Sequence, residues 1–132
     1  MIDPIFLRTD LAGPYRAKPE QIANSLPALI QITKAKDIAS LLTELGQKLA
    51  FPDHFGGNFD ALYDCLCDPE ITPQQTLVLV FENISEVDEA EADTLIAVLQ
   101  AVSDEWRDQQ RGFWSLFTQA KIDLDPLPRP NT

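Results

Sequence analysis

The chain is poor in the residues that build disulfides and metal sites. It contains two cysteines, Cys65 and Cys67, and one histidine, His54. The cysteines stand two apart in a segment with helical spacing, so their side chains diverge and an intramolecular disulfide would require unwinding the helix. These three residues are too few to complete a tetrahedral zinc site. The sequence therefore predicts no metal and no cofactor, and it favours a reducing compartment.

Long apolar segments and glycine-rich phosphate loops are also missing. The first eight residues hold no apolar stretch long enough for a signal peptide, and no segment is long enough to span a membrane. The length of 132 residues suits one domain with a workable core, and the chain has no internal repeats. We therefore expect a cytoplasmic protein with no membrane partner.

Positive charge is absent from the middle of the chain. No lysine or arginine stands between Lys48 and Arg107, whereas acidic residues recur throughout that interval, and the formal net charge is −11. Such a surface repels phosphate backbones and attracts basic proteins. The charge argues against direct nucleic-acid binding and favours a cationic protein partner. The alternative explanation is that the acidity serves solubility alone.

The apolar pattern predicts a small α/β domain. Apolar runs at residues 28–33, 77–81 and 113–117 are typical of strands, and the second resembles a parallel strand covered on both faces. Helical spacing of apolar residues predicts helices over residues 38–49, 59–67 and 90–106, and one or two helical turns at residues 19–24. Strand–helix–helix–strand order implies right-handed crossovers. We expect a three-stranded, mostly parallel sheet packed with about four helices.

The two ends of the chain lie outside this pattern. Residues 1–25 are punctuated by Pro4, Pro14 and Pro19, and we interpret them as a poorly defined extension lying against the domain. Residues 26–118 form the predicted domain. Residues 119–132 contain three prolines and are expected to be a loose tail.

Residues 51–66 carry the most specific pattern. Gly56 and Gly57 free the backbone for a sharp loop, and Asn58 is a good N-cap, so a helix should begin at Phe59. One face of that helix is apolar and suited to burial, while a separate face carries a stripe of carboxylates that points outward. The apolar face holds Phe59, Leu62 and Leu66, and the stripe holds Asp60, Asp64 and Asp68.

The carboxylate stripe does not help the helix to form. Like charges at i, i+4 destabilise an isolated helix by roughly 0.2–0.5 kcal/mol. Asp60 lies in the first turn, where the macrodipole favours an acid, but Asp64 lies too far along to share that benefit. Two interpretations remain open from the residues alone: a solvated helix face or a binding surface.

The same stretch resembles the barstar family, which are intracellular protein inhibitors of the ribonuclease barnase. The family shows an aromatic pair, a Gly-x-Asn loop and the run Asp-Ala-Leu-Trp-Asp-Cys-Leu. In this chain the three parts correspond to residues 54–55, 56–58 and 60–66, and both aspartates of the run are kept. The resemblance extends over about residues 28–117 and implies a barstar-like fold.

The resemblance also implies an inhibitor that mimics the charge of RNA. A ribonuclease binds phosphate with arginine and lysine, so carboxylates on a rigid helix can occupy the phosphate positions. In this interpretation Asp64 enters the phosphate-binding pocket and Asp60 pairs with a flanking cation. A gapless extension of the match places Asp104 at an acidic contact position of a later helix. The implied partner-binding residues are His54, Phe55, Gly56, Asn58, Phe59, Asp60, Tyr63, Asp64 and Asp104.

Two other classes of function compete with the inhibitor. Asp60, Asp64 and His54 could bind a divalent ion or act in acid–base chemistry, but no second cluster supplies the remaining ligands and no nucleophile is paired with a base. A barstar-like module that binds a different basic toxin or regulator is the second alternative. It is favoured by His54 in place of an aromatic residue, by Gly57 in place of an acidic one and by the N-terminal extension. Tyr63 in place of tryptophan is a third departure from the family pattern.

The sequence thus predicts a protein that is not an enzyme, binds a basic ribonuclease one-to-one and takes no small-molecule substrate. Within the predicted site, Phe59 lies on the apolar face and is expected to be a core residue before it is a contact residue. Tyr63 is expected beside Asp60, where it could support the contact face, and its alternative role is that of a core or half-buried aromatic residue. Trp106 is predicted to be part of the core.

Overall fold

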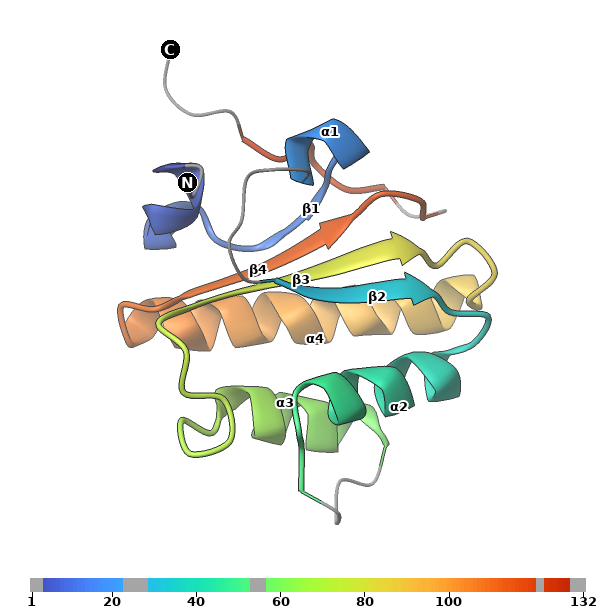
Figure 1. Ribbon diagram of the computed structural model, residues 1–132, viewed down its shortest axis with the longest axis horizontal. Coiled ribbons are helices and arrows are strands. Elements are labelled where there is room, and N and C mark those ends of the chain that lie inside the picture. The colour runs from blue at the N-terminus through green and yellow to red at the C-terminus, as the bar shows by residue number, and fades with distance from the viewer. Residues whose placement is uncertain (1–3, 23–28, 53–56, 121–122, 129–132) are drawn as a thin grey trace.

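The fold is a single parallel sheet with helices on it. The computed structural model describes residues 4–22, 29–52, 57–120 and 123–128. Strand order is β1-β4-β3-β2, and every neighbouring pair is parallel (Figure 1). In chain order the elements are η1 (Pro4–Leu7), η2 (Thr9–Leu11), β1 (Pro14–Arg16), α1 (Pro19–Ile22), β2 (Ile30–Lys34), α2 (Ile38–Lys48), α3 (Phe59–Cys67), β3 (Thr76–Asn83), α4 (Glu89–Asp108) and β4 (Gly112–Phe117).

The α/β class, the parallel sheet and the four α-helices agree with the prediction, but the expected number of strands is wrong. The sheet has four strands rather than three, because the N-terminal segment contributes β1. Tyr15 of β1 lies opposite Leu116 of β4. Three residues that begin with Pro14 carry almost no strand signal, and proline is tolerated here because β1 lies at the edge of the sheet.

One face of the sheet packs on helices α2, α3 and α4. Phe81 of β3 and Phe117 of β4 stack on this face with ring centroids 4.7 Å apart. Trp106 of α4 is fully buried, as predicted for a core residue. Asp37 caps the start of α2, since its carboxylate accepts a 2.8 Å hydrogen bond from the backbone N–H of Ser40.

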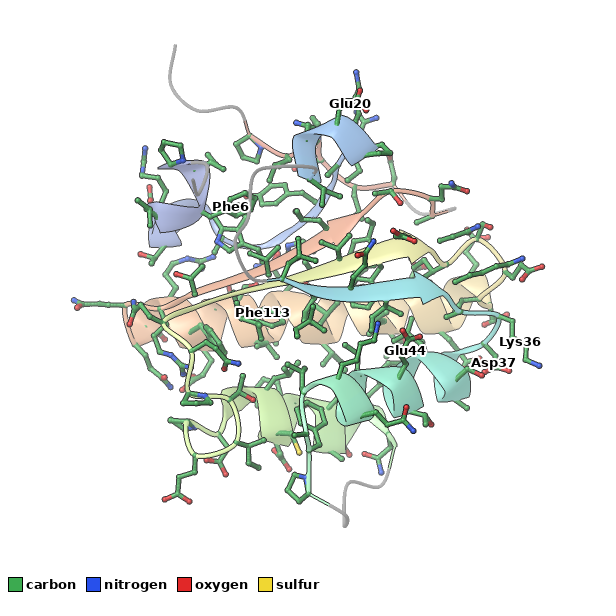
Figure 2. The ribbon with its side chains drawn as sticks, in the orientation of Figure 1. Phe6, Glu20, Lys36, Asp37, Glu44 and Phe113 are labelled. Atoms are coloured by element: carbon green, nitrogen blue, oxygen red, sulfur yellow. The ribbon has the colours of Figure 1, made fainter. Side chains whose placement is uncertain are left out.

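The opposite face of the sheet is covered by the N-terminal segment, described over residues 4–22. Phe6 and Trp114 are both fully buried there, and their rings meet edge-on with centroids 4.9 Å apart. Figure 1 shows η1 and α1 on the other side of the sheet from the three long helices, and Figure 2 labels Phe6 and Phe113 on opposite sides. The segment therefore completes a second apolar layer.

Residues 123–128 of the C-terminal tail are attached to β1, in contrast to the expected loose tail. The backbone N–H of Arg16 donates to the carbonyl of Asp125 (2.9 Å), and that of Leu127 donates to the carbonyl of Arg16 (2.8 Å). Leu127 is buried in the same apolar layer as Phe6. No helix in the described ranges is long and apolar enough to cross a membrane.

Replacing Phe6 should test the second apolar layer. Phe6→Ala removes a fully buried ring and is expected to lower the free energy of unfolding by about 3–5 kcal/mol. Its neighbour Leu7 is 67% exposed, so Leu7→Ala should change stability by no more than about 0.5 kcal/mol. Urea denaturation followed by tryptophan fluorescence measures both. Equal effects of the two variants would show that the segment does not pack on the sheet.

Candidate functional site

Helix α3 begins where the sequence predicts, because its first turn is capped. The side-chain oxygen of Asn58 accepts a 2.7 Å hydrogen bond from the backbone N–H of Ala61. Gly57, directly before the cap, has a φ of +67°, in the left-handed region that glycine adopts without strain. The helix ends at Cys67, two residues before Pro69, as expected from the proline. Both ends of α3 are thus fixed by local chemistry.

The buried face of α3 fixes how the helix is rotated. Leu62, Cys65 and Leu66 are buried against the core. The indole N–H of Trp106 donates to the carbonyl of Leu66 at 2.9 Å, which joins the end of α3 to α4. Because this face is held by packing and by a buried hydrogen bond, the opposite face of α3 must point outward.

The loop that follows α3 is held by a buried arginine. Arg111 donates to the carbonyls of Thr72 (2.6 Å) and Gln74 (3.0 and 2.7 Å). Its guanidinium lies 3.8 Å from the centroid of the Trp106 ring, a cation–π contact. The two residues together fasten both α3 and its following loop to the C-terminal end of α4.

Asp60 and Asp64 form the exposed acidic surface of α3. Both side chains are exposed, and no lysine or arginine of the described ranges forms an ion pair with either. Asp68, the third member of the predicted stripe, is half-buried and accepts a 2.9 Å hydrogen bond from the backbone N–H of Glu70. Asp68 therefore serves the turn after the helix, and the open pair consists of Asp60 and Asp64.

Phe59 and Tyr63 lie between the core and the surface. Both are half-buried and pack against the main apolar cluster. The charge of Cys67 and a hydrogen bond with its side chain raise the pKa of Tyr63, and the nearby acids Glu105 and Asp64 act in the same direction. Tyr63 thus borders the acidic surface, while Phe59 contributes mainly to packing.

Asp104 is on a different side of α4 from the one that faces α3. Its carboxylate accepts hydrogen bonds from Arg107 (2.8 Å) and Gln100 (3.0 Å), and these bonds lower the pKa of Asp104. Arg107 also donates to the carbonyl of Ala12 at 2.8 Å, so this side of α4 faces the N-terminal segment.

Glu105, which sequence reasoning missed, is the acid of α4 that lies toward α3. It is half-buried, and its charge contributes to the raised pKa values of Tyr63 and Cys67, although burial is the main cause for Cys67. Helical periodicity places residues 104 and 105 both outside the apolar face of α4 that is buried in the core. Only the way α4 packs on α3 decides which of them faces the site.

The structure brings Asn58, Phe59, Asp60, Tyr63 and Asp64 together on α3 and its cap. The predicted contacts at residues 54–56 lie outside the described residues. Within the described ranges, no three histidine, cysteine or acidic side chains form a group that could hold a metal ion.

The fold and this surface define a small α/β protein with an exposed acidic helix face, with which no lysine or arginine of the described residues pairs. A family model described as "Barstar (barnase inhibitor)" matches residues 26–118, and the chain belongs to this family. The resemblance seen in the sequence is thereby confirmed. The chain is also 34% identical over 74 residues to "Putative ribonuclease inhibitor YrdF" of Bacillus subtilis (strain 168), a match that covers 56% of this chain and 81% of that protein. Strand β1 and the C-terminal tail lie outside the family match.

Asn58→Ala should weaken the capped start of α3. Loss of the side-chain acceptor is expected to lower the free energy of unfolding by about 1 kcal/mol. Asn58→Asp keeps an acceptor at the same position and should stay close to wild type. Urea denaturation of the three proteins gives the comparison, and an Asp variant as unstable as the Ala variant would contradict the capping role.

Proposed function

We propose that this protein inhibits a basic ribonuclease by placing α3 and the loop before it in the active site of the enzyme. The observation that carries the proposal is the exposed pair Asp60 and Asp64, which no described cation neutralises, on a helix whose other face is fixed in the core. Arginine and lysine that bind RNA phosphates accept such carboxylates through charge-assisted hydrogen bonds. Membership of the barstar family supports the same conclusion.

Each residue of the surface has a distinct role in this proposal. Asp64 enters the phosphate-binding pocket and pairs with its arginines, while Asp60 pairs with a cation at the rim. Glu105 extends the acidic surface from α4. His54 and Phe55 pack against the enzyme beside the pocket, where an RNA base would otherwise bind.

The rigidity of α3 supports tight binding. A binding helix that is already ordered loses little conformational freedom on association, so more of the interaction energy appears as affinity. The Asn58 cap and the bond between Trp106 and Leu66 provide that order before any partner arrives. The net charge of −11 adds long-range attraction to a basic enzyme.

The proposed complex contains one inhibitor and one ribonuclease, and it needs neither a cofactor nor catalysis by this chain. Blocking the site requires only that the carboxylates remain in place, so no bond is made or broken. We propose the cytoplasm as the place where the inhibitor acts.

Asp64→Ala should abolish most of the inhibition. Removing the acid leaves arginines of the enzyme buried and unpaired, which is expected to raise Kd on the order of 100-fold, or ~3 kcal/mol. Asp93→Ala removes the same charge from an exposed position near the N-terminal end of α4 and should have little effect. RNA hydrolysis by a panel of microbial guanyl-preferring ribonucleases, titrated with each protein at two salt concentrations, provides the measurement.

Two outcomes would count against this proposal. If no ribonuclease of the panel is inhibited, the module that binds a different basic protein becomes the better explanation. If both variants lose activity equally, net charge rather than the α3 surface governs binding.

A further inference from the structure

Two neighbouring acids of α4 have different surroundings. Asp104 accepts hydrogen bonds from Arg107 and Gln100 on the side that faces the N-terminal segment. Glu105 lies toward α3, near Tyr63 and Cys67, and accepts a 3.3 Å hydrogen bond from the uncharged side chain of Gln109. Asp104 is therefore paired with a cation, whereas Glu105 forms no ion pair with a lysine or arginine of the described residues and lies beside the proposed binding surface.

Arg107 is held by the N-terminal segment before any partner arrives. One guanidinium nitrogen donates to Asp104 and another donates to the carbonyl of Ala12, both at 2.8 Å. Ala12 is buried in the second apolar layer, and the adjacent Gly13 carbonyl accepts a 3.1 Å hydrogen bond from the backbone N–H of Ser115. The acceptor is thus anchored to β4, and the arginine side chain is only 35% exposed.

This anchoring makes the ion pair persistent. An ordinary ion pair at the surface contributes little stability, because two long side chains must lose conformational freedom to form it. Here the bond to Ala12 has already ordered Arg107, so little further ordering is needed to hold its charge against Asp104. A cation of a partner that approached Asp104 would therefore meet a carboxylate whose charge this arginine already offsets.

We propose that Ala12, Arg107 and Asp104 form a charge mask, in which the arginine offsets the charge of Asp104 and leaves Glu105 as the acid of α4 that attracts and meets the ribonuclease. The inference rests on the proposed function. It makes Arg107 a specificity-determining residue: a matching ribonuclease must place its cations opposite α3 and Glu105. Because Ala12 lies outside the family match, the mask depends on a segment added to the family domain.

Removing Arg107 should leave the negative charge of Asp104 without its paired cation. At low salt, Arg107→Gln is expected to raise the association rate constant for the ribonuclease by about threefold. Lys36→Gln makes the same change in net charge at the opposite end of the molecule (Figure 2) and should change the rate by less than about 1.5-fold. The double variant Arg107→Gln with Asp104→Asn has the wild-type net charge and should return to the wild-type rate, which also shows that the fold survives.

Glu105 and Asp104 should contribute differently to the affinity for the ribonuclease. Glu105→Gln is expected to raise Kd about tenfold, through loss of a charge-assisted hydrogen bond, whereas Asp104→Asn should change Kd less than about twofold. In the free protein, carboxyl NMR titration should give a higher pKa for Asp104 in Arg107→Gln than in wild type, because the hydrogen bond and positive charge of the arginine are lost.

The outcomes separate the mask from the proposed function. If the wild-type protein inhibits a ribonuclease but Arg107→Gln and Lys36→Gln change the association rate constant equally, the mask alone is overturned. The same conclusion follows if Asp104→Asn and Glu105→Gln change Kd equally. An unchanged pKa of Asp104 in Arg107→Gln also overturns the mask, and this result does not depend on any ribonuclease. Absence of binding to every ribonuclease tested overturns the proposed function and the specificity role of Arg107 with it.

Discussion

The contact between Trp106 and the end of α3 is the constraint on which the acidic surface depends. The buried indole N–H of Trp106 donates to the carbonyl of Leu66, at the last turn of α3. The guanidinium of Arg111 lies over the ring of Trp106 and holds the loop that follows α3. Since the ring, the helix end and the loop must fit together, α3 has one rotation, and that rotation turns Asp60 and Asp64 outward.

The elements between residues 30 and 117 could largely be predicted, because their signals are local. Asn58 and Asp37 cap their helices with their own side chains, and the apolar run around Leu79 is typical of a strand buried on both faces. Strand β1 could not be predicted, because its existence depends on pairing with β4 about a hundred residues later rather than on its own three residues.

The site was predictable in part for the same reason. The spacing of Asp60 and Asp64 on one helix follows from 3.6 residues per turn, so the sequence alone places them on one face. Glu105 and Asp104 belong to another helix, and their assignment depends on how two helices pack. The role of Asp68 in a turn likewise depends on backbone that helical periodicity does not describe.

The pairing of the first strand with the last has a consequence for biosynthesis. Pro14 lies opposite Ser115, so β1 has no β4 partner until about a hundred further residues have been made. Contacts this distant in sequence form slowly, and domains fold during synthesis from the N-terminus onward. On the ribosome, β2, α2, α3 and β3 emerge before β4, which contains Trp114. Strand β1 therefore stays unpaired with β4 during this time, although it is synthesised before these elements. The docking of β1 is therefore expected to be the step that completes the sheet, once β4 has emerged from the ribosome.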